Sequence, residues 1–124
     1  MTVIASDKAP KALGPYSQAV LVGTTLYLSG QIAINRATGE FVQSSIEAET
    51  EQIMHNMEAV LEEAGFAFRH VVKTTIFATD IKDFEAINAV YAKFFKVDPP
   101  ARSFVQVAAL PKGARVEIEA IAYK

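Results

Sequence analysis

Apolar residues recur along the chain at helical spacing in two places, and the first predicts a helix over residues 45–64. Ser44 and Glu47 stand three residues apart before it, as in a capping box. Gly65 follows as a C-terminal stop. The apolar face consists of Ile46, Ile53, Met57, Val60, Leu61 and Ala64.

A second helix is predicted after Asp83, a residue type that caps helix N-termini. Its apolar stripe contains one polar residue, Asn88, and the pair Pro99-Pro100 prevents the helix from continuing. The stripe is formed by Phe84, Ile87, Tyr91, Phe94 and Phe95.

Runs rich in β-branched and aromatic residues, separated by glycine and proline turns, predict the strands. With the helices they give the order β-β-α-β-α-β-β, and an extra short strand is expected at residues 3–5. Two helices among mostly antiparallel strands indicate an α+β sandwich, with both helices on one face of the sheet. The predicted strands are 18–22, 26–29, 71–80, 104–110 and 116–123.

Several of these strands are apolar on both faces, although the helices can cover only one. Ile76 and Phe77 point to opposite faces, and residues 104–109 are apolar on both. In the strand 116–123 the even positions are all apolar, while the odd ones start charged and end apolar. A second buried face needs a cover. We therefore expect copies of the chain to associate through their sheets.

Composition narrows the class of protein. The chain has 124 residues, 51% hydrophobic and 21% charged, which fits one globular domain over residues 1–124. The absence of cysteine excludes disulfides, thiolate zinc sites and a cysteine nucleophile. A net charge of −2 argues against a nucleic-acid partner. No apolar run approaches the roughly 20 residues of a membrane span, so we expect a cytoplasmic protein without a membrane partner.

Two charged residues in the C-terminal quarter are candidates for chemistry. Arg102, at the start of an apolar strand, presents a planar fork suited to a carboxylate or phosphate. The alternative is a surface arginine with a solvated head. Glu117, if partly buried, would have a raised pKa and could act as a general base. The alternative is a solvent-facing residue paired with Arg115 or Lys112, and Glu119 shares its face.

Other polar and small residues are weaker candidates. Asn88 on the apolar stripe must find hydrogen-bond partners, either to hold a loop or to line a pocket. Gly30, after Ser29, would let a ligand approach the backbone, and Tyr16 follows a Gly-Pro turn. The alternatives are a packed aromatic ring and a simple strand-end turn.

Motifs for metals and cofactors are missing from the sequence. His55 and His70 do not have metal-ligand spacing, and no other cluster resembles a metal site. Dinucleotide-binding, phosphate-loop and serine-nucleophile motifs are absent too. We therefore predict neither a metal nor a cofactor.

Sequence blocks spread over nearly the whole chain resemble, in the right order, the RidA family, also called the YjgF family. The combination of Pro100–Ser103 with Val116–Ala122 is the most specific part of the resemblance. The other matching blocks are Gly14–Ala19, Leu28–Gln31, Thr38–Glu40, Val72–Phe77 and Leu110-Pro111, with Asp83-Phe84, Asn88, Tyr91 and Phe95 between them.

The resemblance implies a chorismate-mutase-like α+β fold and a homotrimer with three clefts between subunits. It also implies cofactor-free hydrolysis of 2-imino acids or their enamine tautomers, such as 2-iminobutanoate and 2-iminopropanoate, to 2-oxo acids and ammonia. The chemistry is reasonable without a metal, because the nitrogen already makes the attacked carbon reactive. Orientation and a general base can then suffice.

The same resemblance implies roles for individual residues. Arg102 would hold the substrate carboxylate, and Glu117 would activate the attacking water. The remaining candidates would hold substrate or water or line the cleft: Tyr16, Ser29, Gly30, Asn88 and Phe104. Many relatives have cysteine where this chain has Phe104, so a role for that thiol is lost here and the larger ring is expected to narrow the pocket.

Three other functions compete with the deaminase. The same clefts could bind small 2-oxo or amino acids as a sensor, without turnover. A ribonuclease or translation-inhibitor activity has been attributed to some relatives, but the net charge of −2 and the lack of a basic stripe weigh against it. A chaperone-like role would need apolar surface that a trimer should hide.

Overall fold

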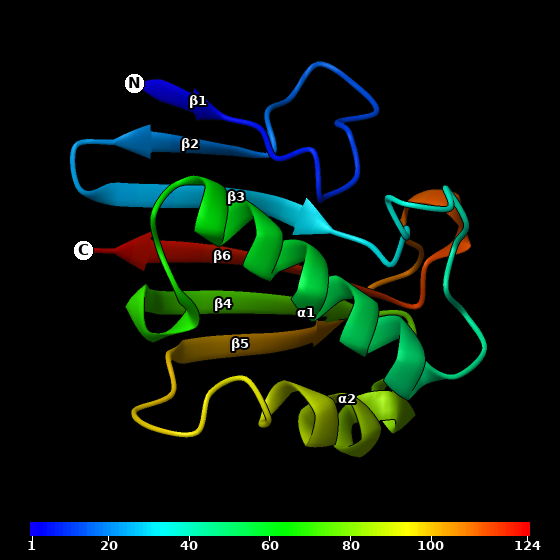
Figure 1. Ribbon diagram of the computed structural model, residues 1–124. Helices are drawn as coiled ribbons and strands as arrows, with labels where there is room; N and C mark the ends of the chain where they lie inside the picture. Colours follow the sequence, from blue (N-terminus) through cyan, green and yellow to red (C-terminus); the bar gives the residue numbers. More distant parts are fainter.

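A six-stranded sheet carries two helices on one of its faces in the computed structural model, which describes residues 1–124 (Figure 1). The strand order is β1-β2-β3-β6-β4-β5, and all neighbours are antiparallel except β4 and β5. The predicted α+β class and element order are therefore confirmed. The elements are β1 Thr2–Ile4, β2 Ala19–Val22, β3 Thr25–Gln31, α1 Ile46–Glu63, β4 Val71–Ala78, α2 Phe84–Tyr91, β5 Ala101–Gln106 and β6 Val116–Tyr123.

Helix α1 begins one residue later than the predicted capping box requires. Ser45, not Ser44, is the N-cap, and its side chain accepts a hydrogen bond of 3.0 Å from the backbone N–H of Ala48. Two adjacent serines offer the same chemistry, and the extended backbone of Ser45 decides between them. At the other end Gly65 adopts a φ of +79°, as expected of a helix stop.

The start of α2 also differs from the expectation. Asp83 occupies the N-cap position but makes no capping hydrogen bond, because it belongs to a preceding 3₁₀ turn, Ile81–Asp83. That turn is capped by Asp80, which accepts a hydrogen bond from the Lys82 N–H at 2.9 Å. After Tyr91 the chain continues in tighter turns rather than as α-helix.

One strand lies several residues away from its predicted place. The expected strand at residues 104–110 is β5, which starts at Ala101 and ends at Gln106. Its position follows from parallel pairing with β4, in which Ala78 lies opposite Gln106. Because β4 ends there, the residues after Val107 have no partner strand. Strand β6 has the predicted bounds, and β1 lies one residue before the predicted extra strand.

The two faces of the sheet have different surroundings. Side chains on one face pack against α1, which crosses that face in Figure 1, and form the core with Ile53, Met57 and Leu61. The other face has no cover within the chain, so apolar side chains remain partly exposed there. They include Val22, Tyr27, Phe77, Val105, Ile121 and Tyr123. Neither helix has the length and apolar character needed to cross a bilayer.

Candidate functional site

Arg102 is held between aromatic rings on the helix-covered side of the sheet. It lies on β5, and its Nη1 donates a 2.6 Å hydrogen bond to Oδ1 of Asn88 on α2. Its guanidinium carbon is 5.0 Å from the centroid of the Tyr91 ring and 5.7 Å from those of Phe84 and Phe104. Such contacts orient a guanidinium without using its N–H donors. Asn88 is therefore a partner of Arg102 rather than a loop anchor.

The guanidinium retains hydrogen-bonding capacity for a ligand. Of its five N–H donors, only the one bonded to Asn88 has a partner within the chain. A hollow of about 230 Å³ opens beside it, lined by the helix α2 and the segment that leads to Pro99. This arrangement suits bidentate binding of a carboxylate or phosphate.

Tyr91 connects this arrangement to the sheet. Its hydroxyl forms a buried 2.7 Å hydrogen bond with Oγ1 of Thr74, and Thr74 is the register partner of Arg102 on β4. Burial raises the pKa of the Tyr91 phenol, so the group stays neutral near pH 7. The ring thus has a fixed position under the guanidinium.

Glu117 is half-buried on β6 and points to the uncovered face of the sheet, next to Phe77 of β4. Burial raises the pKa of its carboxyl group, and the nearby charge of Glu119 raises it further. The predicted alternative, a pair with Arg115 or Lys112, is wrong, because Arg115 bonds to Glu49 with an Nε–Oε1 distance of 2.8 Å and Lys112 forms no ion pair. Glu119 is exposed, which distinguishes the two glutamates that sequence spacing left equivalent.

Gly30 makes room for the Glu117 carboxylate. A Cβ atom at position 30 would overlap Oε2 of Glu117 and lie 2.8 Å from its Cδ. The pairing of β3 with β6 shifts register between Leu28 and Gln31, which brings Gly30 against the carboxylate. Beside it, the hydroxyl of Ser29 donates a 2.6 Å hydrogen bond to the carbonyl oxygen of Ser17.

Tyr16 lies near the same end of β3. Its side chain is half-exposed, and its hydroxyl accepts a 3.2 Å hydrogen bond from the backbone N–H of Leu13. Tyr16 and Gly30 line one small hollow of about 30 Å³. The N-terminal segment therefore forms one wall over the backbone of β3.

The predicted residues separate into two half-sites within one chain. The arginine half-site contains Arg102, Asn88 and Phe104, and the carboxylate half-site contains Glu117 with Tyr16, Ser29 and Gly30. Arg102 lies in register with Thr74 and Ala120, whose side chains are buried in the core. Glu117 points to the opposite face, and β4 separates its strand from β5. The strand spacing alone separates them by about 10 Å.

Two neighbours of Arg102 were not predicted from the sequence as part of the candidate site. Phe84 and Tyr91 were assigned to the apolar stripe of the second helix, yet both rings face the guanidinium of Arg102. Their spacing of seven residues, with Asn88 between them, places all three on one side of the helix and is the signal that could have found them. No group of three or more His, Cys, Asp or Glu side chains comes together as a metal site.

Comparison with known proteins finds relatives that match nearly the whole chain. The family model described as Endoribonuclease L-PSP matches residues 6–124. A human protein named 2-iminobutanoate/2-iminopropanoate deaminase is 51% identical over 120 residues, covering 97% of this chain and 88% of that protein. The solved structure of RidA from an Antarctic Psychrobacter species has a TM-score of 0.96 at 45% identity, covering 100% of both chains. That of E. coli TdcF with bound serine has a TM-score of 0.96 at 39% identity, covering 100% of this chain and 99% of that one. The chain therefore belongs to the Endoribonuclease L-PSP family, the family of RidA.

Proposed function

We propose that this protein hydrolyses small 2-imino acids, such as 2-iminobutanoate and 2-iminopropanoate, to 2-oxo acids and ammonia. The observation that carries the proposal is the presence in one chain of an oriented arginine with unpartnered N–H donors and a half-buried glutamate whose pKa is raised. The name of the human relative supports the substrate class. The serine bound to TdcF supports a site for a small molecule with a carboxylate and a nitrogen on the next carbon.

In the proposed reaction, Arg102 binds the substrate carboxylate through two hydrogen bonds. Glu117 accepts a proton from a water molecule, and the water oxygen attacks C2 of the imine. As the C–O bond forms, Glu117 passes this proton to the imine nitrogen, giving a tetrahedral amino alcohol. Glu117 then takes the proton of the new hydroxyl group and returns it to the amino nitrogen, so the C–N bond breaks, ammonia leaves and the oxygen becomes the carbonyl of the 2-oxo acid. Glu117 needs a pKa close to the working pH to serve both proton transfers, and its burial shifts the pKa in that direction.

The two half-sites would meet between subunits of a homotrimer. The uncovered sheet face has partly exposed apolar side chains that a second copy can bury, and β5 is an edge strand with the arginine half-site beside it. In this arrangement one subunit contributes Arg102 and its neighbour contributes Glu117 to each of three clefts. The neighbouring subunit that covers the sheet face would also complete the site.

Phe104 would limit the size of the substrate. Its ring packs against Phe84 with a centroid distance of 4.8 Å and lies beside the Arg102 guanidinium. It therefore occupies space near the group that would hold the carboxylate. A small aliphatic side chain on the substrate fits this restriction better than a large one.

A threonine dehydratase can supply the imine for a direct test, with the decay of 2-iminobutanoate followed by absorbance. We expect the wild-type protein to accelerate the decay and Arg102→Ala to lose this effect while keeping its oligomeric state. Arg69→Ala is a matched control, because it removes an arginine away from both half-sites. Acceleration by Arg102→Ala equal to that of the wild type would refute the proposal.

The sensor alternative is tested with the same two proteins. It requires saturable binding of a 2-oxo or amino acid that depends on Arg102, without acceleration of imine decay. The serine in TdcF is the observation that favours it. Release of ammonia by the wild type at a rate above that of uncatalysed hydrolysis would decide for the enzyme.

A further inference from the structure

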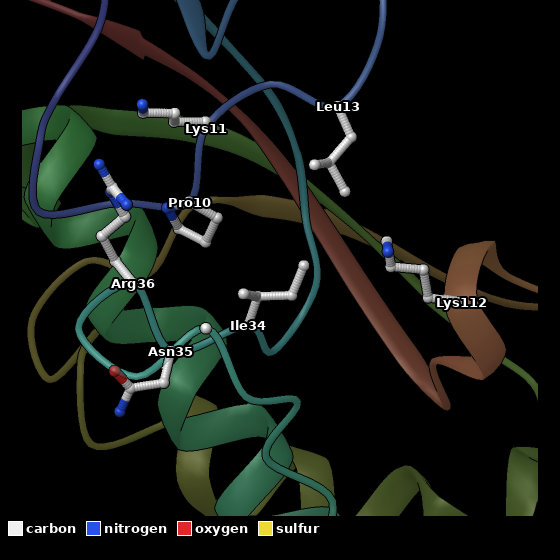
Figure 2. A pocket seen from close by; sticks show the side chains of 8 residues that line it. Pro10, Lys11, Leu13, Ile34, Asn35, Arg36 and Lys112 are labelled. Carbon is white, nitrogen blue, oxygen red and sulfur yellow. The ribbon is translucent and has the colours of Figure 1, made fainter.

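A third hollow, of about 250 Å³, lies outside the two half-sites (Figure 2). It is bounded by the N-terminal segment, the turn after β3 and the 3₁₀ turn Pro111–Gly113. Three cations line it, Lys11, Arg36 and Lys112, and no acidic residue does. We call it the basic hollow. Figure 2 shows Lys11 and Arg36 on one side of it and Lys112 on the other.

The positive charge of the basic hollow is not compensated within the chain. None of the three cations forms an ion pair, although the chain as a whole has a net charge of −2. The Nε atom of Arg36 is buried and has no hydrogen-bond partner. A buried N–H without an acceptor is unfavourable, and an anionic oxygen at this place would satisfy it.

The backbone holds these cations in defined positions. The side chain of Asn35 accepts hydrogen bonds from two backbone N–H groups of its own turn, at 2.9 and 3.2 Å, and so fixes the segment that contains Arg36. Lys112 adopts a left-handed conformation with φ +56°, which is uncommon for a residue with a side chain. Gln43 donates a 3.0 Å hydrogen bond to the carbonyl of Gly113 and holds this turn from outside.

The basic hollow adjoins the small hollow of the carboxylate half-site. Lys11 and Leu13 line both the basic hollow and the small hollow that contains Tyr16 and Gly30. Leu13, with Ile34, adds apolar surface to the cationic walls. A concave site of this size with mixed walls suits a small molecule better than an extended polymer.

We propose that the basic hollow binds a small molecule through an anionic group, either a phosphate or a carboxylate. Such a ligand lies next to the carboxylate half-site. The binding itself does not depend on the deaminase reaction, so the two proposals can fail separately.

Backbone amide chemical shifts give a direct test at constant ionic strength. Inorganic phosphate, pyrophosphate and malonate are titrated separately, with sodium chloride as the reference salt. We expect saturable shifts in residues 34–39 and 111–113 with at least one probe and none with chloride. Saturation by the two phosphates alone assigns a phosphate group, and saturation by malonate alone assigns a carboxylate.

Variants locate the binding. Arg36→Gln is expected to weaken it by roughly tenfold or more, because one charge-assisted contact is lost. Lys112→Asn removes a second charge with a residue that tolerates the left-handed backbone. Lys82→Gln removes an exposed lysine elsewhere and should leave affinity unchanged. Arg102→Ala should also leave it unchanged, which separates this site from the proposed catalytic one.

Several results would overturn the proposal. One is the absence of saturable shifts with all three probes, and another is equal affinity in Arg36→Gln, Lys112→Asn and the wild type. Loss of binding only in Arg102→Ala would place the anion at the arginine half-site instead. Tighter binding of a short RNA than of pyrophosphate, at the same salt concentration, would reject a small-molecule ligand.

Discussion

The carboxylate of Glu117 lies directly over Gly30, so closely that any side chain at position 30 would overlap it. The two residues come from neighbouring antiparallel strands, at the point where the register shifts. The absence of a side chain on one strand thus determines where the carboxylate of the other can lie. Both belong to the carboxylate half-site.

Gly30→Ala is therefore expected to displace the Glu117 carboxylate and reduce deaminase activity by about 10²-fold or more. The protein should remain folded, because the clashing atoms are the end of a flexible side chain that can move away from position 30. Steady-state kinetics with circular dichroism measures both effects. Gly14→Ala is the control, since a Cβ there would make only an ordinary 3.7 Å contact with Tyr16. Full activity in Gly30→Ala would contradict a role for the Glu117 position.

The raised pKa of Glu117 predicts a specific pH dependence. Its carboxylate must be ionised to accept a proton, so kcat/KM should fall as the pH drops through this raised pKa, at a higher pH than for an ordinary glutamate. Glu119→Gln removes a like charge, which lowers the pKa and should move the acid limb to lower pH. Glu117→Gln should lose activity at every pH. If kcat/KM of Glu119→Gln falls at the same pH as that of the wild type, Glu117 is not the titrating group.

The raised pKa of Glu117 also affects the stability of the fold. A carboxyl group whose pKa is higher in the folded state stabilises the fold below its unfolded pKa, and this contribution is lost as the pH rises through the folded pKa. Glu117→Gln removes the burial of a charge, so it should raise Tm at pH 7. The difference from the wild type should shrink in acid. Thermal unfolding at pH 4 and pH 7 measures this, and a lower Tm at pH 7 would contradict it.

Two substitutions at Tyr91 distinguish the effect of its hydroxyl group from the effect of its ring. Tyr91→Phe leaves the buried Thr74 hydroxyl without its partner and should destabilise the fold by about 1–3 kcal/mol, with little change in KM. Tyr91→Leu also removes the ring 5.0 Å from the Arg102 guanidinium, so KM should rise as well. Denaturant unfolding and kinetics on both variants make the comparison. Equal KM values in the two variants would show that the ring does not orient Arg102.

Ile121 tests the role of the uncovered sheet face. Its side chain is partly exposed and lies opposite Tyr27 of β3. Ile121→Asp places a charge where another copy is expected to pack, so it should dissociate the oligomer and abolish activity. Val97→Asp, at a position that is 79% exposed outside the sheet, should do neither. Sedimentation velocity reports the assembly, and an unchanged oligomer of Ile121→Asp would locate the interface elsewhere.

Much of the fold followed from local patterns in the sequence. The helix over residues 45–64 and the strand at 116–123 have strong periodicity and were predicted within a few residues. The predicted bounds of the strand after Pro100 were wrong because its register is set by β4, whose paired residues are 28 positions earlier, as in Lys73 with Ala101, and not by its own composition. The serine at the α1 N-cap was missed because Ser44 and Ser45 are chemically equivalent and only the backbone conformation separates them.

The candidate site was predictable as a set of residue types but not as an arrangement. The sequence placed Arg102 just before one predicted strand and Glu117 inside another, and it left open which face of the sheet each would use. The register of β5 and β6 on β4 places them on opposite faces. The aromatic support around Arg102 was assigned to the core, because rings at helical spacing look the same whether they pack on aliphatic side chains or on a guanidinium.

The separation of Arg102 and Glu117 on opposite faces of one chain has a consequence for mixtures of variants. If each cleft combines Arg102 of one subunit with Glu117 of the next, then Arg102→Ala and Glu117→Gln each destroy all the clefts of their own trimers. When the two inactive proteins are unfolded, mixed in equal amounts and refolded together, an intact cleft forms wherever the two kinds of subunit are adjacent in the right order. Random assembly restores about one quarter of the clefts. In such a protein the unit of catalytic function is the contact between chains, and two defective copies can complement each other.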